Sequence, residues 1–386
     1  MRILHVITTL DVGGAEMHLL AQVRGQRARG HAPRVAYLKG QGTLAPDFLA
    51  AGAQSVERLP LGPLFPLRLA RLARGADIVH THLLKADMAV AACALGRQAR
   101  AHLVSSKHND EQVLKRALVG RIHGWLGNRP ARTIVLSEHV GAFLAEHGRV
   151  RREKLVRIYY GLEPAPFLEA SAAPESARAA LRASFGFSPE DVVFVCVARF
   201  APQKAHHVLL EALARARASE PRLALLLVGD DPFGDGRQRA EKLAGELALG
   251  GRCVFAGIRR DVPAILAACE GFVMSSLWEG LGLVFLEAMA ARLPVVASRV
   301  SAVPEVVVEG ETGLLCAPGD PEDLARGLLA LAADPALRAR LGEAGHRRVR
   351  ASFGLERMVE ETLAVYAGVQ RAAGLQIPEA RGPIAR

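Results

Sequence analysis

The chain has 386 residues, half of them hydrophobic, and a formal net charge of +10. This length is too great for one ordinary core and suits two domains of roughly 150–200 residues each, while the hydrophobic share excludes general disorder. The chain contains no run of about 18 uncharged apolar residues, which excludes a membrane-spanning helix.

Short apolar runs alternate with Ala-, Leu- and Arg-rich helical patterns along the whole chain. This alternation predicts parallel sheets with helices on both faces. In the first half, the expected strands are 3–8, 34–38, 77–82, 101–105, 133–136 and 156–159. In the second half, they are 192–197, 224–228, 253–256, 271–274, 294–297 and 313–316.

The expected strands fall into two groups, separated at 161–188 by a segment rich in Pro, Ala, Ser and Glu. We therefore predict an α/β protein with two Rossmann-like, doubly wound domains, 1–165 and 166–355, which face an inter-domain cleft. Ligands of such sheets bind beyond the carboxyl ends of the strands. The last residues, 371–386, lose periodicity and are predicted to form a disordered tail.

Two features of the sequence bear on its compartment. The five cysteines are dispersed, and no two share a metal-ligand or redox spacing, which indicates free thiols in a reducing compartment. The N-terminus, where His5 interrupts the first apolar run, lacks the long apolar region and cleavage site of a signal peptide. We expect a cytoplasmic protein, either free or peripheral at the inner face of the membrane.

The positive charge lies in the first half of the chain. Residues 1–165 hold 24 Lys/Arg and 12 Asp/Glu, which leaves 25 and 27 of the totals of 49 and 39 for the remainder. This asymmetry favours an anionic partner for the first domain, such as a membrane surface or a phosphate-bearing substrate, although a coding bias towards Arg explains it equally well. With 5% aromatics and no recognisable motif, nucleic acid is not an expected partner.

The first domain contains a glycine turn and several histidines near the ends of expected strands. Gly13 and Gly14 follow the first strand, but they do not form the G-x-G-x-x-G fingerprint of dinucleotide binding. His80 and His82 share one face of a strand; a metal site would need further ligands, and the sequence shows no cluster, so we predict no metal. His108 follows another strand, where it could assist acid/base chemistry or orient an acceptor. Each histidine also fits a purely structural role.

A basic segment at 112–126 interleaves cations with Leu, Val, Ile and Trp. Such a helix could lie on an anionic membrane surface. It could also be an ordinary amphipathic helix that faces its own core, and this second interpretation is preferred.

The second domain places two cations behind its first strand. Arg199 follows the buried run directly, and Lys204 comes five residues later, near the start of the next helix. Two cations at the carboxyl end of a strand can clamp a diphosphate and stabilise it as a leaving group. Without further context they could equally be surface charges.

Two glutamates, Glu279 and Glu287, flank a glycine-bearing turn that leads from a strand into a helix. The helix start supplies free N–H groups for an anion, and Gly280 and Gly282 let the backbone approach a phosphate closely. Carboxylates at these positions suit sugar hydroxyls on either side of a diphosphate. Each glutamate alone could be a solvated loop charge or a helix-dipole partner, but the joint pattern favours a binding site.

Taken together, these motifs resemble family 4 of the retaining glycosyltransferases, whose members have the GT-B fold. The two glutamates look like the paired E-x7-E of that family, and the resemblance covers about residues 1–365. Matching elements include 13–16, 198–200, 203–204, 227–230, 255–257, 293–298, 304–306 and 313–315. A helix at about 355–370 is then expected to pack back on the first domain.

The resemblance implies transfer of a sugar from a nucleotide-diphosphate sugar, with UDP or GDP as the nucleotide, to a hydroxyl acceptor with retention and without a metal or other cofactor. Arg199 and Lys204 would neutralise the diphosphate, and the backbone amides of Gly282 and Leu283 would hold it. Glu287 would bind the ribose hydroxyls.

Further roles follow from the same resemblance. Glu279 would contact the transferred sugar, and the loop at Ile258 would cup the base. Gly14 would approach the phosphates, and His108 would lie near the reacting sugar as a catalytic residue. Gly13 and His82 are expected on the acceptor side.

The sequence departs from the family pattern at three places. Ala205 stands where glycine is usual, Ser301-Ala302-Val303 replaces a Gly-Gly pair, and Leu281 replaces an aromatic residue. We expect these changes to alter loop shape and sugar contacts, which leaves the donor sugar open.

Two alternatives remain at this stage: a sugar-nucleotide 2-epimerase and a non-catalytic nucleotide-binding protein. The second predicts loss of the charged site residues, all of which are present. The acceptor, lipid-linked or a cell-envelope glycan, and the oligomeric state are not specified by the sequence.

Overall fold

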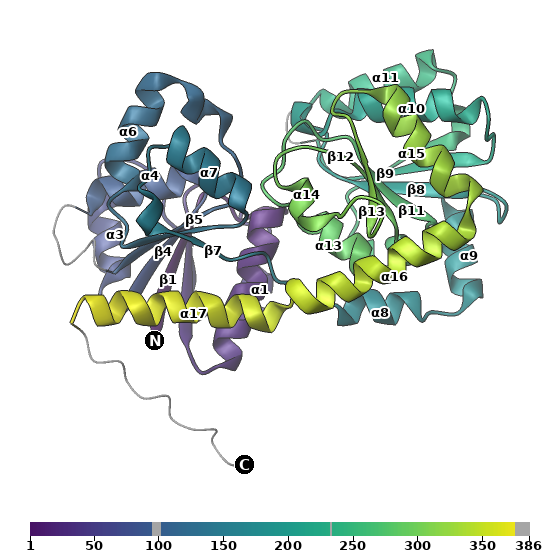
Figure 1. The fold of residues 1–386 in the computed structure, drawn as a ribbon. Coiled ribbons are helices and arrows are strands. Elements are labelled where there is room, and N and C mark those ends of the chain that lie inside the picture. Colours follow the sequence, from purple (N-terminus) through teal and green to yellow (C-terminus); the bar gives the residue numbers. More distant parts are fainter. Residues whose placement is uncertain (95–101, 232–233, 375–386) are drawn as a thin grey trace, which may run out of the picture. The chain divides into compact units, whose positions relative to one another are not determined.

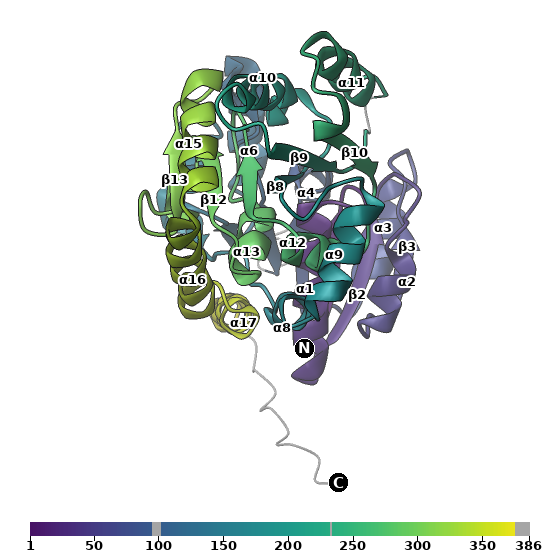
Figure 2. The ribbon, with the colours of Figure 1, turned by 90° about the vertical axis from the view of Figure 1, so that its right-hand side faces the viewer.

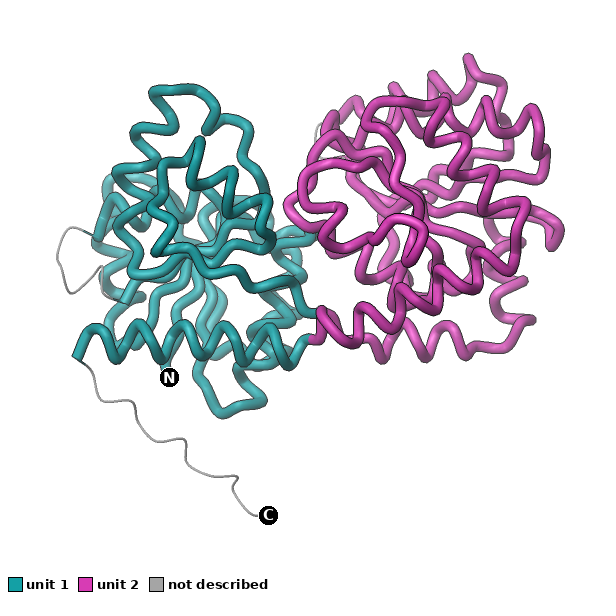
Figure 3. The backbone as a smooth tube through the Cα atoms, in the orientation of Figure 1, with its two compact units in different colours: residues 1–161, 355–386 teal, residues 162–354 magenta. Residues whose placement is uncertain are grey.

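The computed structural model describes residues 1–94, 102–231 and 234–374, which divide into two compact units (Figures 1 and 3). Unit 1 comprises residues 1–161 and the C-terminal segment from Leu355, and unit 2 comprises 162–354. Each unit is built around one parallel sheet with helices on both faces, so the prediction of an α/β protein with two Rossmann-like domains is confirmed. Most of the expected tail, 375–386, lies outside the described residues.

The sheet of unit 1 has seven parallel strands in the order β3-β2-β1-β4-β5-β6-β7. Their bounds are β1 Arg2–Ile7, β2 Ala32–Tyr37, β3 Val56–Arg58, β4 Ile78–His82, β5 Leu103–Lys107, β6 Arg132–Val135 and β7 Leu155–Arg157. The sequence predicted six of them and missed β3, because its three residues include Glu57 and Arg58 and form no apolar run. The strand order reverses between β1 and β4, which is where sheets of this kind bind ligands.

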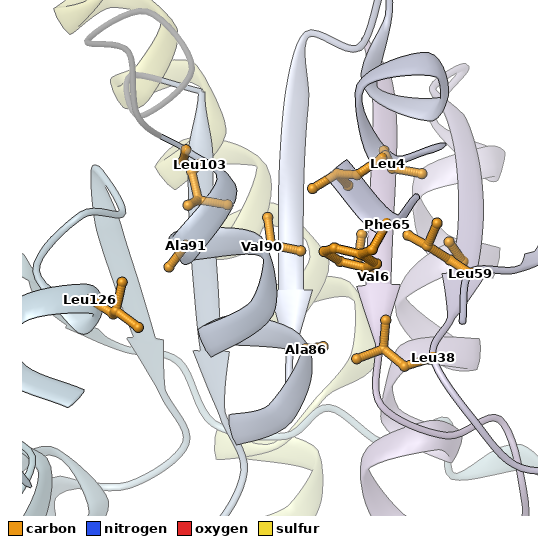
Figure 4. Packing of buried hydrophobic residues seen from close by; sticks show 13 residues of the cluster. Leu4, Val6, Leu38, Leu59, Phe65, Ala86, Val90, Ala91, Leu103 and Leu126 are labelled. Carbon is orange, nitrogen blue, oxygen red and sulfur yellow. The ribbon is translucent and has the colours of Figure 1, made fainter. Parts of the chain in front are cut away.

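The helices of unit 1 form two layers. One layer consists of α3 (Phe65–Ala73), α4 (Leu84–Cys93) and α6 (Ala117–Gly127), which share a core cluster with β1 (Figure 4). The other layer consists of α1 (Gly14–Ala28), α2 (Ala45–Ala50) and α17 (Leu355–Ala372). The remaining elements are η1 (Gln112–Lys115), α7 (Glu138–Glu146) and η2 (Arg152–Lys154).

Helix α17 belongs to unit 1 although the chain reaches it from unit 2. Its Met358, Val359 and Tyr366 pack against strand residues of β1 and β4. A Cβ atom on Gly25 of α1 would lie 2.5 Å from a methyl group of Val359, so the close approach of α1 and α17 requires glycine there.

The sheet of unit 2 has six parallel strands in the order β10-β9-β8-β11-β12-β13. Their bounds are β8 Val192–Val197, β9 Leu223–Val228, β10 Cys253–Gly257, β11 Gly271–Met274, β12 Val295–Ser298 and β13 Gly313–Cys316, each within two residues of the predicted strand. These continuous Val- and Leu-rich runs are typical of strands covered on both faces. The strand order reverses between β8 and β11.

Helices cover both faces of this second sheet, as Figure 2 shows with unit 2 towards the viewer. α10 (His206–Arg217) packs with α11 (Gly236–Glu246) and α15 (Pro321–Ala333). On the other side, α12 (Val262–Ala267) packs with α8 (Ala165–Ser171) and α9 (Glu175–Ser184), and α13 (Leu283–Ala290) packs with α16 (Pro335–Ser352). The short elements are η3 (Pro202–Lys204), η4 (Gly250–Arg252) and α14 (Val303–Val306).

None of the helices in the described part of the chain combines the length and the apolar character needed to cross a bilayer.

Candidate active site

Two loops meet at the carboxyl edge of the unit 2 sheet, one behind β8 and one behind β11. The two strands are neighbours in the sheet, so the residues that follow them emerge side by side. The Leu277 amide donates to the Gln203 carbonyl at 2.8 Å, and the Gln203 side chain donates to the Trp278 carbonyl at 2.6 Å. The Ser275 hydroxyl donates to the Lys204 carbonyl at 2.9 Å. These bonds fix the loop that carries Lys204 against the loop that carries the first glutamate.

Lys204 and Glu279, which are 75 residues apart in sequence, form an ion pair between Nζ and Oε1. The Ser276 hydroxyl donates to the same carboxylate oxygen at 2.6 Å. The side chains are only 13% and 6% exposed, so the interpretation of Glu279 as a solvated loop charge is wrong. A buried pair of this kind depends on both partners, because loss of either leaves an uncompensated charge.

Arg199 lies at the same edge, directly after β8. Its side chain is exposed and has no ion-pair partner among the residues that the structure describes. Next to it, a Cβ atom on Gly229 would lie 1.9 Å from the Ala198 carbonyl oxygen, so the ends of β8 and β9 pack with no room for a side chain. The guanidinium is therefore available to an anion at a closely packed sheet edge.

Helix α13 begins at Leu283 behind this loop and presents its N-terminus at the same edge. Gly282 occupies the N-cap position with φ 82°, and no side chain caps the helix. A Cβ atom on Gly282 would lie 2.5 Å from the Phe285 ring, so both the backbone angle and the space require glycine. The first-turn N–H groups and the helix dipole favour an anion here.

Glu287 lies in the second turn of α13. Burial raises the pKa of its carboxyl group to about 7. Within the described residues, the side chain has neither an ion-pair nor a hydrogen-bond partner, which leaves its oxygens free to accept hydroxyl protons from a ligand. A dipole interaction in the first helical turn does not explain this residue, because its position is beyond that turn.

An apolar side chain completes this edge of the sheet. Ile258 follows β10 and is 60% exposed, and the preceding Gly257 adopts φ 68°. Leu277, in the loop behind β11, is 40% exposed. The predicted donor-binding residues of unit 2 thus all lie behind β8, β10 and β11 at one sheet edge.

Two positions keep the backbone that glycine favours although they carry side chains. Ala205 adopts φ 46° and Ser301 adopts φ 45°, both in the left-handed region. Both lie where the resemblance to the family leads us to expect glycine. The substitutions therefore leave the left-handed turns in place, at the cost of local strain.

Unit 1 contains a chain of buried histidines in β1, at the end of β4 and directly after β5. His5 Nε2 bonds to the Gln26 Oε1 atom at 2.9 Å, and His5 Nδ1 bonds to His82 Nε2 at 3.1 Å. His82 Nδ1 bonds to His108 Nε2 at 3.2 Å, and His108 Nδ1 bonds to the Tyr160 hydroxyl at 3.1 Å. The structure thus brings together the two predicted histidines, His82 and His108.

The amide oxygen of Gln26 fixes which ring nitrogen donates and which accepts in each hydrogen bond of this chain. Because it can only accept, His5 must donate through Nε2, which leaves its Nδ1 as the acceptor for His82. His82 then donates through Nε2 and accepts at Nδ1 from His108 Nε2. His108 in turn accepts at Nδ1 from the Tyr160 hydroxyl. All three rings are then neutral, in agreement with burial, which lowers the pKa of His5 to about 4 and of His108 to about 3.

His80 lies on the same face of β4 as His82, as predicted, but in a second branch. Its Nδ1 bonds to the Tyr366 hydroxyl of α17 at 2.6 Å, and its Nε2 bonds to Ser106 at 2.7 Å. Ring nitrogens of His5, His80 and His82 also lie within 4.8 Å of one another, a metal-compatible grouping that the sequence did not reveal. Each of these nitrogens already has a protein partner, so the geometry favours the hydrogen-bond network.

His18 of α1 is another buried residue that the sequence did not single out. Its ring centroid lies 4.5 Å from that of Tyr160 and 5.5 Å from that of His108. Its Nδ1 has no hydrogen-bond partner in the described part of the chain. This buried nitrogen beside the histidine chain can form a hydrogen bond with a polar group of a ligand.

The glycine turn before α1 is compatible with a close ligand. A Cβ atom on Gly13 would lie 2.5 Å from the Glu16 carboxylate, whereas a Cβ atom on Gly14 would meet nothing within 4 Å. Neither glycine has a positive φ angle. The fold of unit 1 therefore does not itself require glycine at position 14.

Both units match known families. Residues 12–165 match the family described as Glycosyltransferase Family 4, and residues 177–348 match the family described as Glycosyl transferases group 1. The two matches cover most of both units.

Similar proteins bear related names. The lipopolysaccharide core biosynthesis glycosyltransferase LpsE of Rhizobium meliloti is 39% identical over 181 residues, 47% of this chain and 51% of that protein. That match thus spans only about half of the relative. The D-inositol 3-phosphate glycosyltransferase of Streptomyces bingchenggensis is 29% identical over 95% of this chain and 87% of that protein. The crystal structure of Anabaena Alr3699/HepE in complex with UDP-glucose has a TM-score of 0.84 and 25% identity, and covers 95% of this chain and 100% of that chain.

Proposed function

We propose, from the premise that this chain belongs to the family 4, group 1 glycosyltransferases with the GT-B fold, that it transfers a sugar from a nucleotide-diphosphate sugar to a hydroxyl acceptor with retention of configuration. The predicted family is confirmed by the two family matches. One observation carries the proposal: four features share one sheet edge of unit 2. They are the buried Lys–Glu pair, an uncapped helix N-terminus, and a guanidinium and a carboxyl group that have no partner among the described residues.

The diphosphate of the donor binds to the positively charged groups of this site. Arg199 is exposed and can bind two phosphate oxygens with its planar fork, and the N-terminus of α13 offers backbone N–H groups. Lys204 then shifts from Glu279 towards the phosphates. The carboxylate of Glu279, released in part from its cation, accepts a hydrogen bond from a hydroxyl of the transferred sugar.

The nucleoside takes the remaining groups. Glu287 has free carboxylate oxygens for the two ribose hydroxyls, and the exposed Ile258 packs against the base. UDP is the first candidate nucleotide because Alr3699/HepE was crystallised with UDP-glucose, and GDP the second because a Mycolicibacterium relative, 36% identical over 178 residues, is named as GDP-mannose-dependent.

For the transfer itself, the acceptor hydroxyl attacks the anomeric carbon on the face that the diphosphate leaves. The bond from the anomeric carbon to the phosphate oxygen breaks, the bond to the acceptor oxygen forms, and the acceptor proton passes to the departing phosphate. Arg199, Lys204 and the helix N-terminus stabilise the negative charge that develops on the diphosphate. Since these groups supply the positive charge, we propose that no metal is needed.

The acceptor is assigned to unit 1. We place its reacting hydroxyl near His108, with Gly13 and His82 on the same side and Gly14 towards the donor phosphates. His18, whose Nδ1 has no partner in the described part of the chain, is free to accept a hydrogen bond from it. The basic charge of this unit and the names of LpsE and of a phosphatidylinositol monomannoside mannosyltransferase support an anionic, lipid-linked or cell-envelope acceptor. All five cysteines are free thiols, which supports a cytoplasmic site of action.

The 2-epimerase and the non-catalytic alternatives are not favoured. The relatives that we name carry transferase names, and the four charged residues that we propose for the donor lie at one sheet edge. A 2-epimerase would turn over donor without an acceptor, which the following experiment detects.

The test is a panel of UDP-, GDP- and ADP-sugars, with binding measured by calorimetry and slow donor hydrolysis measured by release of the nucleotide. Glu287→Ala is expected to weaken nucleotide binding at least about tenfold, and Arg199→Ala is expected mainly to lower turnover. Arg350→Ala, at an exposed arginine of α16 in the same unit, is the matched control. If both site variants kept wild-type binding and turnover, the proposed site would be refuted. If EDTA abolished turnover and a divalent cation restored it, metal independence would be refuted.

A further inference from the structure

Helix α6 packs into unit 1 through its glycines. A Cβ atom on Gly120 would lie 2.5 Å from the His147 carbonyl oxygen, and one on Gly124 would lie 2.7 Å from the Arg149 Cβ atom. On Gly127, a Cβ atom would lie 3.2 Å from a methyl group of Val150. The inward face of this helix therefore has no room for side chains at three successive turns.

Three large apolar residues of α6 point the other way. Leu118, Ile122 and Trp125 are 71%, 48% and 67% exposed. Their spacing of four and three residues places them on one face of the helix, opposite the glycines. The segment packs on its own core through Leu114 and Leu126 as well as through these glycines, as the preferred interpretation expects. The three exposed residues form a second apolar face that this core does not cover.

Cations border this stripe along the chain. Between Glu111 and Glu138 the chain has five Lys/Arg residues and no acidic residue. Lys115, Arg116 and Arg121 are exposed and form no ion pair with any residue that the structure describes. The Arg129 guanidinium lies over the Trp125 ring, 4.0 Å from its centroid. An apolar stripe with a tryptophan and a basic border matches the composition of helices that bind the headgroup region of anionic bilayers.

We propose that the outward face of α6 docks on an anionic lipid bilayer. Leu118, Ile122 and Trp125 enter the boundary between headgroups and acyl chains, while the flanking cations contact lipid phosphates. Helix α6 lies at the edge of unit 1 (Figure 1). The stripe belongs to this one helix and has a basic border, which suits the surface of an anionic bilayer. The proposal is independent of the transferase activity.

Vesicle flotation of the full chain tests this proposal. We expect binding to vesicles of phosphatidylcholine with about one third phosphatidylglycerol, and little binding to pure phosphatidylcholine, at low salt. The triple variant Leu118→Ser/Ile122→Ser/Trp125→Ser should lose binding by at least about tenfold. Leu49→Ser, at a residue of α2 that is 52% exposed on the other helical layer, should bind as the wild type does. Wild-type binding of the triple variant would overturn the proposal.

A charge comparison separates a local docking face from general attraction by a basic protein. Lys115→Ala/Arg116→Ala/Arg121→Ala removes three exposed cations of η1 and α6, and Arg68→Ala/Arg71→Ala/Arg74→Ala removes three exposed cations of and next to α3. The first variant should weaken binding several-fold more than the second. Equal weakening by the two variants would show that net charge alone acts, and would overturn the proposal.

The depth of insertion is read from Trp125. With anionic vesicles, its fluorescence should shift to shorter wavelength and be quenched by brominated acyl chains, and Trp125→Phe should keep binding but lose both signals. Persistence of both signals in Trp125→Phe would assign them to Trp278 in unit 2 and contradict the proposed face. If the wild type self-associated without lipid and the triple serine variant did not, a second copy of the chain, rather than a bilayer, would be what binds the outward face of α6. Far-UV circular dichroism checks that each variant is folded.

Discussion

The Lys204 ammonium and the Glu279 carboxylate form a buried ion pair, and the Ser276 hydroxyl donates to the same carboxylate oxygen. Lys204→Met leaves a buried carboxylate unpaired and should lower the free energy of unfolding of unit 2 by about 3 kcal/mol. Glu279→Gln leaves the ammonium unpaired, with a loss of similar size. The double variant should recover part of this loss, because no uncompensated charge remains.

These variants form a double-mutant cycle. Calorimetry measures the free energy of unfolding of the wild type, both single variants and the double variant. All three variants should also lose transferase turnover, because both side chains belong to the proposed donor site. Additive losses in the double variant would show that the two residues do not interact, contrary to the structure.

Glu287 gives unit 2 a stability that falls with rising pH. Burial raises the pKa of this carboxyl group from 4.5 to about 7, so the folded protein holds the proton more tightly than the unfolded chain. Stability is therefore greatest below pH 4.5 and declines as the pH rises through 7, by on the order of 2–3 kcal/mol. Glu287→Gln should remove this decline, so that it is more stable than the wild type at pH 8 and equal near pH 4.5, while nucleotide binding weakens. A stability difference that does not change with pH would contradict the assignment.

The histidine chain gives unit 1 the opposite dependence. Burial lowers the pKa of His5 to about 4 and that of His108 to about 3, while an unfolded histidine titrates near 6.5. The unfolded chain thus binds protons first on acidification, and stability that is complete above pH 6.5 is lost as the pH falls towards 4. Calorimetry between pH 4.5 and 8 should show unit 1 melting earlier in acid.

Gln26 fixes the direction of hydrogen-bond donation along this chain, so its replacement should lower the free energy of unfolding even at neutral pH. Gln26→Leu leaves the His5 N–H group buried without an acceptor and should cost about 1–3 kcal/mol. Gln54→Leu, at an exposed glutamine, should change stability by no more than about 0.5 kcal/mol. Nitrogen chemical shifts of the three rings report their tautomers; a wild type in which His5 carries its proton on Nδ1 would refute the assigned direction.

Ala205 and Ser301 hold left-handed backbone angles that cost an L-residue energy. Ala205→Gly and Ser301→Gly should each raise the free energy of unfolding by about 0.5–1 kcal/mol, since glycine relieves the strain but adds flexibility to the unfolded chain. Gly282→Ala is the contrasting variant, because φ 82° and the Phe285 ring exclude a Cβ atom there. Denaturant unfolding measures all three, and a loss of stability in both glycine variants would contradict the backbone assignment.

The sequence predicted the strands of both sheets, apart from β3, because buried parallel strands are continuous apolar runs bounded by turns. The resemblance to the family, rather than the spacing of strands, led to the prediction that Arg199, Lys204, Glu279 and Glu287 belong to one site. The sequence did not predict that Lys204 and Glu279 pair with each other. That contact joins loops 75 residues apart and depends on side-chain directions that spacing does not specify.

Long-range contacts explain the other omissions. His5 interrupts an apolar strand, and only the sheet order that places β1 beside β4 brings it to His82. Tyr160 and Gln26 join from a loop and a helix that no local pattern connects to these strands. Helix periodicity located the apolar stripe of α6 but not which side faces the core, because the glycines that form the inward face carry no hydrophobic signal.

The close packing of the α6 glycines and the exposure of Leu118 make opposite predictions for the two faces of this helix. Alanine is a better helix former than glycine, yet Gly120→Ala and Gly124→Ala should destabilise unit 1 by about 1–3 kcal/mol, because the added Cβ atom meets a backbone oxygen or a side-chain carbon below 3 Å. Leu118→Ser, at a side chain that is 71% exposed, should cost no more than about 0.5 kcal/mol. Thermal unfolding of the three variants decides between the orientations. If alanine stabilised the helix and serine destabilised it, the leucine face would be the buried one, and the surface available to a membrane would be the glycine face instead.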